Sequence, residues 1–266
     1  MSYFTNINHS IYYYQSNGYT YVESPWIVDE EISNITKPSD RTNFYVGSKT
    51  LVASGEQSFL QLIKDNRLEP GKYITTTPCF RDENEDDTHK KYFLKTELIV
   101  WNHSNSNFDF VSELEKVKNE CLNFFLRYLP CHLERQTDGS FDIIDSTFKI
   151  ELGSYGIREN DNVKWIYATG CAEPRLSYVV NKLKKPGYHS TVIPKYQIGE
   201  AGKIFEEYHE FVDALLSGNK IMALVELSDL YGSIEHYLKT VFPNITMNDL
   251  DIMNKTTQKA FTNKRR

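Results

Sequence analysis

The chain has 266 residues, 40% of them hydrophobic, and a formal net charge of −6. This length suits one large domain or a large domain with a small one, and the acidic balance argues against a surface built for general nucleic-acid adhesion. No apolar run approaches the roughly 20 residues that a membrane-spanning helix needs. The four cysteines are scattered and form no C-x-x-C pair, so we expect a cytoplasmic protein with reduced thiols.

Short apolar runs alternate with loops between about residues 20 and 180. Four runs have the length and composition of strands: Tyr73–Phe80, Phe93–Trp101, Phe141–Leu152 and Val163–Cys171. Two further segments carry apolar residues at helical spacing: Ser58–Leu68 and Asp109–Tyr128. This mixture predicts an α+β fold in which an antiparallel sheet is flanked by helices.

A different kind of sequence follows residues 184–199, a stretch with two prolines and little periodicity. Beyond it the strand pattern disappears, and the spacing of apolar residues predicts three helices: Glu200–Leu216, Lys220–Leu238 and one that follows Thr246. We therefore expect two domains, residues 1–189 and 190–266, of which the second is small and all-α.

The strongest chemical pattern lies in the stretch FRDENEDDTHKKYFLKTE. Arg81 and Glu83 end an apolar run, an acidic loop follows, and His89, Phe93 and Glu97 come next at four-residue spacing. A hairpin of the two flanking runs would bring the first four of these side chains to one end. Arginine and histidine suit phosphates, a carboxylate accepts from an amino group, and a flat ring stacks on a base. The stretch therefore predicts a site for a nucleoside triphosphate.

This spacing resembles motif 2 of the class II aminoacyl-tRNA synthetases, F-R-x-E, a loop, then H/R-x-x-x-F-x-x-x-D/E. Other segments resemble further parts of that family, in the family's order: Gly18–Pro25 (motif 1, which builds the dimer interface), Ala53–Gln57 (a loop that holds a substrate α-amino group), Phe148–Ser154 (a strand whose acidic residue faces ATP) and Ala168–Leu176 (motif 3, which leads through an arginine into a helix). Motif 3 departs from the family at Ala172, where a second glycine is usual, and at Pro174.

The resemblance implies that a substrate carboxylate attacks the α-phosphorus of ATP, giving an acyl-adenylate and pyrophosphate. It also implies a role for each matching residue. Arg81 holds the α-phosphate and the carboxylate, Glu83 accepts from the adenine amino group, and His89 holds a second phosphate. Phe93 and Arg175 enclose the base, and Arg175 also reaches the γ-phosphate, whereas Glu151 holds Mg²⁺ and Glu56 binds the substrate amino group. Taken singly, the two arginines are also explained by surface ion pairs, and the polar residues beside the loop by solvation.

Acidic residues recur at one-turn spacing on the first two helices of the second domain. Glu206, Glu207 and Glu210 share a face of one helix, and Glu226 and Asp229 share a face of the next. The first set lies opposite an apolar face, so exposure to solvent is enough to explain acidic residues on that helix. Apolar residues surround the second set, so a bound metal explains its acidic residues better than burial of unpaired carboxylates does. A hairpin of the two helices would join the five residues into a site for Mg²⁺ or Mn²⁺.

The pattern E-E-x-x-E followed by E-x-x-D resembles the MazG-like, all-α nucleotide pyrophosphohydrolases. The resemblance implies Mg²⁺-dependent cleavage of an NTP or dNTP between the α and β phosphates, with Glu207 and Glu210 among the catalytic residues. It also implies that Lys255 or Lys259 near the basic end meets phosphates. A short helical domain leaves apolar faces uncovered, so a homo-oligomer is expected.

Three functions stay open from the sequence. In the first, the chain is a bifunctional enzyme that cleaves an NTP or dNTP and also adenylates an amino acid or similar carboxylate. In the second, only the pyrophosphohydrolase is active, and the first domain senses nucleotide or mediates dimerisation. In the third, the protein is a tRNA-associated binding protein without catalysis. No anticodon-binding module is recognisable, so the sequence does not support tRNA charging, and the acceptor is a tRNA or another molecule.

Overall fold

The computed structural model describes residues 3–38, 40–183, 189 and 193–262, with the backbone alone at 259–262. The chain divides into two compact units, Met1–Lys184 and Lys185–Arg266. Within the described residues, no helix combines the length and the apolar character that crossing a membrane requires.

A seven-stranded sheet forms the centre of the first unit. Its strands lie in the order β1 (Thr20–Tyr21), β5 (Gly71–Phe80), β6 (Tyr92–His103), β10 (Val163–Glu173), β9 (Glu151–Asn160), β8 (Phe141–Asp145) and β7 (Cys131–Arg135). The predicted α+β class is confirmed, but the sheet is mixed, because β1 pairs parallel to β5 while the other neighbours are antiparallel. The long connection between β1 and β5 allows this parallel pairing, which no tight turn could provide.

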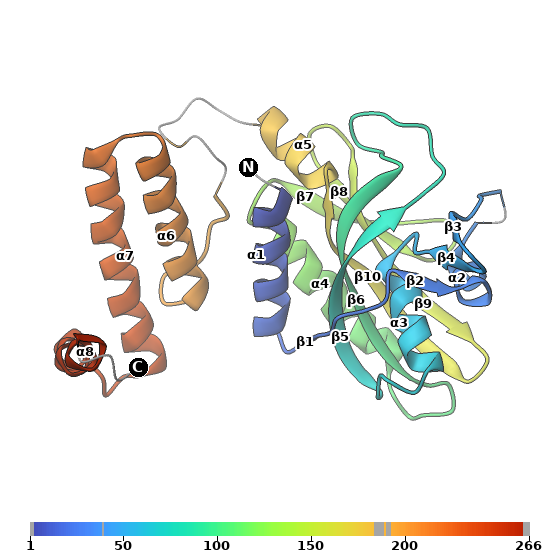
Figure 1. The fold of residues 1–266 in the computed structure, drawn as a ribbon, viewed down its shortest axis with the longest axis horizontal. Helices are drawn as coiled ribbons and strands as arrows, with labels where there is room; N and C mark the ends of the chain where they lie inside the picture. The colour runs from blue at the N-terminus through green and yellow to red at the C-terminus, as the bar shows by residue number, and fades with distance from the viewer. Residues whose placement is uncertain (1–2, 39, 184–188, 190–192, 263–266) are drawn as a thin grey trace. The chain divides into compact units, whose positions relative to one another are not determined.

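Helices cover both faces of the sheet (Figure 1). α1 (Tyr3–Ser16) and α4 (Phe110–Leu126) pack on one face, where the rings of Tyr13 and Phe124 lie 5.5 Å apart. α3 (Gly55–Lys64) packs on the other face, against β5 and β6. The remaining elements are α2 (Glu30–Thr36), α5 (Arg175–Leu183) and a three-stranded sheet of β2 (Ile27–Asp29), β4 (Lys49–Leu51) and β3 (Tyr45–Val46).

Strand alternation decides which residues face α3. On β6, Ile99 and Trp101 pack with Phe59 of α3 in a buried apolar cluster. Trp165 of β10 belongs to the same cluster and pairs in register with both Trp101 and Arg158 of β9. Alternate residues of β6, β9 and β10 therefore share the α3 face, and this places polar side chains from three strands around one hollow.

The predicted elements did not include β7, α2 or the three-stranded sheet, and two further parts of this unit differ from the prediction. The stretch expected to form one strand, Phe141–Leu152, is split into β8 and β9, because the buried Asp145 carboxylate accepts from the backbone N–H groups of residues 147, 148 and 150 and turns the chain. α1 lies outside the predicted elements. Its buried positions include Asn6, Ser10 and Tyr14, which are polar or aromatic and give only a weak apolar stripe.

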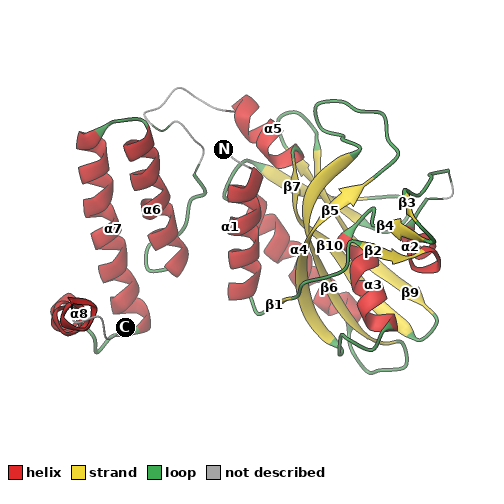
Figure 2. Ribbon diagram, in the orientation of Figure 1, coloured by secondary structure: helices red, strands yellow, loops and turns green. Residues whose placement is uncertain are grey.

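The described part of the second unit consists of helices (Figure 2). The three predicted helices are present as α6 (Ala201–Leu216), α7 (Lys220–Val241) and α8 (Met247–Thr262). α6 and α7 pack together, and a short turn joins them. In that turn Gly218 adopts φ +75°, and the Asn219 side chain accepts a hydrogen bond from the N–H of Met222 at the start of α7. The turn residues therefore end one helix and begin the next.

Candidate functional site

The β5–β6 hairpin positions the first arginine of the predicted site. Its register pairs Cys79 with Phe93, so Arg81 lies just beyond the end of β5 and beside the start of β6. The guanidinium carbon of Arg81 is 5.1 Å from the centre of the Phe93 ring, and Nε donates to the carbonyl of Ala53 at 3.0 Å. Its Nη1 lies 3.6 Å from Glu83 Oε1. Packing and hydrogen bonds therefore hold this cation at the hairpin end.

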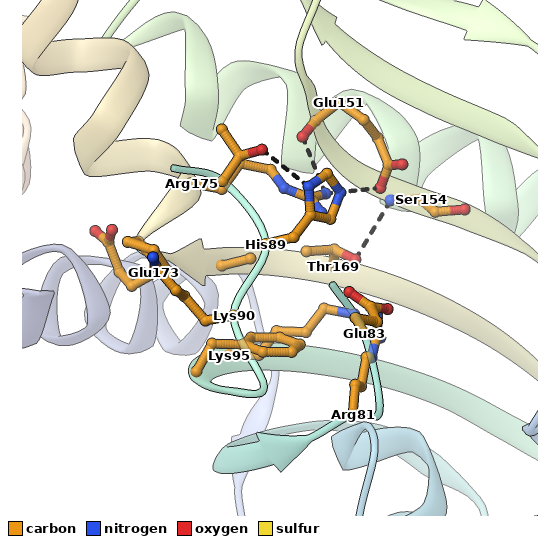
Figure 3. A pocket seen from close by; sticks show the side chains of 14 residues that line it. Arg81, Glu83, His89, Lys90, Lys95, Glu151, Ser154, Thr169, Glu173 and Arg175 are labelled. Atoms are coloured by element: carbon orange, nitrogen blue, oxygen red, sulfur yellow. Dashed lines mark hydrogen bonds and ion pairs between the residues drawn. The ribbon is translucent and has the colours of Figure 1, made fainter. Parts of the chain in front are cut away.

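A cavity of about 160 Å³ opens beside this hairpin (Figure 3). Arg81 and Glu83 lie on one side of it, and Glu151 and Arg175 lie on the opposite side. Its lining includes all six residues that the sequence assigns to ATP binding: Arg81, Glu83, His89, Phe93, Glu151 and Arg175. The structure thus brings together residues that are up to 94 positions apart in the chain (175 − 81).

The wall opposite the hairpin comes from β9 and α5. Glu151 is the first residue of β9, and Arg175 is the first residue of α5, directly after β10. Arg175 Nη1 donates at 3.1 Å to both the carbonyl and the Oε1 of Glu151. His89 lies at the exposed rim, where its Nδ1 is 2.9 Å from Asp86 Oδ2. Arg175, Glu151 and His89 each already have a protein partner, which a phosphate or cation would have to share or replace.

A second cavity of about 290 Å³ adjoins the first and shares Arg81 and Glu83 with it. Its lining includes Glu56, the residue assigned to a substrate amino group. Glu56 is buried, and its two oxygens accept from Trp165 Nε1 at 2.6 Å and from Arg158 Nη1 at 2.5 Å. Burial raises the pKa of Glu56, while the charge of Arg158 and the Trp165 hydrogen bond oppose that rise.

Glu97 is the second buried carboxylate in this cavity. Lys95 Nζ lies 2.7 Å from its Oε1, and the backbone N–H of Gly55 donates to its Oε2. A Cβ at position 55 would lie 3.0 Å from that oxygen, so glycine allows α3 to begin directly over the carboxylate. Solvation therefore does not explain Glu97, because the side chain anchors the start of α3 inside the sheet.

Part of this cavity was not predicted from the sequence. Arg158 stacks on Tyr167, with its guanidinium carbon 4.1 Å from the ring centre, and both line the cavity with Lys95. These residues match no quoted motif, and they lie far in sequence from Glu56. Alternation along β9 and β10 is the signal that could have found them, since every second residue of those strands faces α3.

The stretch Ala168–Leu176 contains a buried carboxylate. Glu173 is 1% exposed and accepts from Asn6 Nδ2 at 2.5 Å, from Ser177 Oγ at 2.9 Å and from the Ser177 N–H at 3.1 Å. Burial raises the pKa of Glu173, and the hydrogen bonds from Asn6 and Ser177 oppose the rise. The peptide bond between Glu173 and Pro174 is cis. Glu173 also lines the first cavity, so this network supports the wall that carries Arg175.

The acidic residues of the second unit converge between α6 and α7. Three groups each place one ligand atom per residue within 4.8 Å of the others: His189, Glu210 and Glu226; Glu206, Glu207 and Glu210; and Glu207, Glu226 and Asp229. All five acids that the sequence assigns to a metal are included, and they form one continuous acid cluster. Hard divalent cations prefer such carboxylate oxygens.

The burial of this acid cluster corrects two expectations. A solvated surface was expected for the acids of α6, but Glu206, Glu207 and Glu210 are buried, at 2%, 5% and 5% exposure. The opposite face of α6 is the exposed one, with Tyr208 at 49%. On α7 both acids were expected to be buried, but Asp229 is exposed. The acids of α6 face α7, and this arrangement leaves apolar side chains outside.

Two lysines neutralise most of the acid cluster. Lys203 Nζ lies 2.6 Å from Glu206 Oε1 and 2.5 Å from Glu207 Oε1. Lys195 Nζ lies 3.1 Å from Glu206 Oε1 and also pairs with Glu210. Neither lysine was predicted from the sequence, although Lys203 lies one turn before the acids on α6 and therefore shares their face.

Glu226 is different from these acids. Its side chain is 1% exposed, and no ion pair among the described residues includes it. Burial and the facing carboxylates of Glu210 and Glu207 together raise the pKa of Glu226 to about 7. A buried carboxylate surrounded by others is unfavourable without a cation, so the residues present here fit a divalent metal ion.

The lysines assigned to phosphates in this unit are less informative. Lys255 is exposed and pairs with Asp251, one turn earlier on α8, at 2.6 Å. The side chain of Lys259 lies outside the described residues. Exposed helical ion pairs of this kind contribute little to stability, so the Lys255 ammonium can be released at small cost.

Comparisons with known proteins address the first unit. Residues 43–134 match the family described as tRNA synthetases class II core domain (F). The structure is similar to the cytoplasmic serine-tRNA ligase from Naegleria fowleri in complex with AMP, with a TM-score of 0.56 and 16% identity over 71% of this chain and 50% of that one. It is also similar to seryl-tRNA synthetase from Pyrococcus horikoshii complexed with ATP, with a TM-score of 0.56 and 15% identity over 71% of this chain and 52% of that one.

Pyrrolysyl-tRNA synthetase from Desulfitobacterium hafniense gives a TM-score of 0.52 at 16% identity, over 67% of this chain and 69% of that one. This chain spans about half the length of the two serine enzymes. No curated protein matches it. The first unit therefore has the fold of a class II tRNA synthetase core domain. None of these comparisons supports a MazG-like second unit, and that resemblance stays a proposal.

The buried Glu173 carboxyl makes stability depend on pH. Because its pKa is raised in the folded state, the folded chain keeps this proton at pH values where the unfolded chain has lost it. The free energy of unfolding should therefore fall as pH rises from the unfolded value of 4.5 through the raised pKa. In Glu173→Gln this part of the pH dependence should disappear.

Denaturant unfolding of both proteins between pH 5 and pH 8 measures the effect. The control is Glu69→Gln, at an exposed position outside this network, which should keep the wild-type pH dependence. A wild-type and a Glu173→Gln curve that stay parallel over the whole range would contradict the prediction.

Proposed function

We propose that the chain is a bifunctional nucleotide enzyme. The first unit activates the carboxylate of an amino acid or similar molecule as an adenylate, and the second is a Mg²⁺-dependent NTP or dNTP pyrophosphohydrolase. The observation that best supports the first activity is the single cavity lined by Arg81, Glu83, His89, Phe93, Glu151 and Arg175. The observation that best supports the second is the acid cluster around the buried Glu226.

In the first unit, the chain's own residues would act mainly by position and charge. Arg81 would hold the α-phosphate and the attacking carboxylate close together, since it lies where the two cavities meet. Phe93 and Arg175 would enclose the base, with Glu83 accepting from its amino group. Arg175 would also reach the γ-phosphate as its bond with Glu151 opens, and Glu151 would then be free to hold Mg²⁺, which offsets phosphate charge.

The substrate would occupy the second cavity. Glu56 would accept a hydrogen bond from the ammonium group of the substrate. Each oxygen of Glu56 has two lone pairs, and Arg158 donates to one oxygen and Trp165 to the other. The acceptor of the activated acyl group would be a tRNA or another molecule. The four cysteines are free and buried, as suits the reducing cytoplasm, where we place this reaction.

In the second unit, the five acids Glu206, Glu207, Glu210, Glu226 and Asp229 would hold Mg²⁺, with Mn²⁺ as a substitute. The metal supplies Lewis-acid polarisation of the phosphates when bound. Glu207 and Glu210 would orient and deprotonate the water that attacks between the α and β phosphates. Lys255 or Lys259 would contact the phosphates. The products would be a nucleoside monophosphate and pyrophosphate.

An alternative assigns catalysis to the second unit alone. It is favoured by the bonds between Arg175 and Glu151 and between Arg158 and Glu56, which already satisfy groups that catalysis would need. The first unit would then be a nucleotide-sensing, dimerising or tRNA-binding module. Replacement of Arg81 separates this alternative from the bifunctional proposal.

The Arg81→Ala variant should lose exchange of labelled pyrophosphate into ATP that depends on added amino acid. We expect a loss of about 100-fold or more, because a charge that is placed at the reacting phosphate would be removed. The control is Arg67→Ala, at an exposed position outside both cavities. Absence of exchange in the wild type with every amino acid tested would instead support the alternative.

The Glu226→Gln variant should lose Mg²⁺-dependent release of pyrophosphate from NTPs and dNTPs by at least about 10-fold. Pyrophosphate is measured as phosphate after addition of a pyrophosphatase. Glu235→Gln is the matched control, since Glu235 lies on the same helix but pairs with Lys239 outside the acid cluster. Equal release by wild type and Glu226→Gln would refute the assignment of this activity to the acid cluster.

We further propose that the chain self-associates through the second unit. Exposed apolar side chains on α7 include Ile221 at 78%, Leu224 at 70% and Tyr231 at 57%, a density that a second copy would cover. Light scattering should give the mass of at least two chains, and Leu224→Lys should lower it to one. A wild-type mass of one chain at all concentrations would exclude the interface.

A further inference from the structure

A histidine lies beside the acid cluster of the second unit. The side chain of His189 is 20% exposed, and its Nε2 lies 3.7 Å from Glu210 Oε1. Its Nδ1 lies 3.5 Å from Oδ2 of Asp213. One nitrogen of this ring also lies within 4.8 Å of oxygens of both Glu210 and Glu226. The described residues form three groups that could hold a metal ion, and this is the one that contains a nitrogen ligand.

The position of the ring between two carboxylates is that of a metal-bound histidine with an orienting partner. Asp213 is buried and follows Glu210 by one turn of α6. A proton on Nδ1 would be directed at Asp213, and the lone pair of Nε2 would then face Glu210 and Glu226. Ligands about 2.1 Å from one ion are about 3 to 4.2 Å apart, so the observed spacing requires only a small contraction around an ion.

The charge distribution favours an ion at this point in the acid cluster. In the group of Glu206, Glu207 and Glu210, each acid already pairs with Lys195 or Lys203. Glu226 is 1% exposed and belongs to none of those pairs. It is shared by the other two groups, one with His189 and one with Asp229. An ion bound in either group would pair with this buried carboxylate.

We propose that His189, Glu210 and Glu226 bind a transition-metal dication in preference to Mg²⁺, with Asp213 holding the imidazole in place. This inference rests on the metal centre of the proposed function and deepens it, because it names a nitrogen ligand and the class of metal. Mg²⁺ prefers oxygen ligands and retains its water, whereas transition-metal dications accept imidazole. The group of Glu207, Glu226 and Asp229 offers oxygen alone and would keep Mg²⁺ as a second ion.

Mn²⁺ added to the full-length chain tests the proposal without a substrate. Pulsed electron paramagnetic resonance detects the ¹⁴N coupling of an imidazole nitrogen bound to Mn²⁺, and titration calorimetry measures the affinities for Mn²⁺ and Mg²⁺. In His189→Gln the nitrogen coupling should vanish. The Mn²⁺ affinity should fall by about 10-fold or more, and the Mg²⁺ affinity should change much less. Asp213→Asn should keep the coupling and weaken Mn²⁺ binding to a smaller degree.

The matched control is His236→Gln, at an exposed position on α7 where Nδ1 contacts the carbonyl of Gly232. It should bind Mn²⁺ and show nitrogen coupling as the wild type does. Mn²⁺ binding that depends on Glu226 but shows no coupling from His189 overturns this inference and leaves the proposed metal centre standing. Absence of Mn²⁺ and Mg²⁺ binding in the wild type overturns both.

Discussion

A carboxylate that is buried away from water needs a hydrogen-bond donor or a cation beside it. In both units this need joins segments that are far apart in the sequence. Glu56 of α3 bonds to Trp165 and Arg158 on neighbouring strands. Glu97 of β6 accepts from the first N–H group of α3, that of Gly55. These bonds fix α3 over the sheet. The walls of the second cavity are therefore held in place by charged contacts as well as by apolar packing.

The same need organises the second unit. α6 directs its acids inward, where Lys195 and Lys203 meet them, and leaves apolar side chains such as Tyr208 outside. An isolated amphipathic helix would do the reverse. The inversion requires cations beside the acids, and it leaves the apolar face available to another surface. The proposed acid-cluster chemistry and the proposed self-association would therefore be two consequences of one arrangement.

Local patterns predicted much of the fold and most of the candidate site. The hairpin that carries Arg81 and Phe93 is local in sequence, and its alternation fixes which side chains share a face. The acids at one-turn spacing on α6 and α7 converge for the same reason. Such features depend on neighbours within about one strand or one helical turn, which sequence periodicity describes well.

The parts that the sequence did not predict depend on partners far along the chain. Arg158 faces the second cavity because β9 pairs with β10, and its bond to Glu56 spans 102 residues. α1 is buried through polar and aromatic contacts, such as that of the Tyr14 hydroxyl with the carbonyl of Gly170. The turn at Asp145 is made by one side chain that accepts three backbone N–H groups. The spacing of apolar residues along the sequence does not predict any of these interactions.

The balance of charge at the two sites explains why they would treat a triphosphate differently. The first cavity is lined by four lysine or arginine side chains and three carboxylates, so it can attract a polyanion directly, and its arginines can exchange a carboxylate partner for a phosphate. The acid cluster has five acids and two lysines, so it would repel the same ligand. A triphosphate would reach it only with bound cations, and metal binding would release Lys195 and Lys203 from the acids to meet the phosphates. In the first unit the protein itself supplies the positive charge, whereas in the second unit the metal would have to supply it before the lysines could contribute.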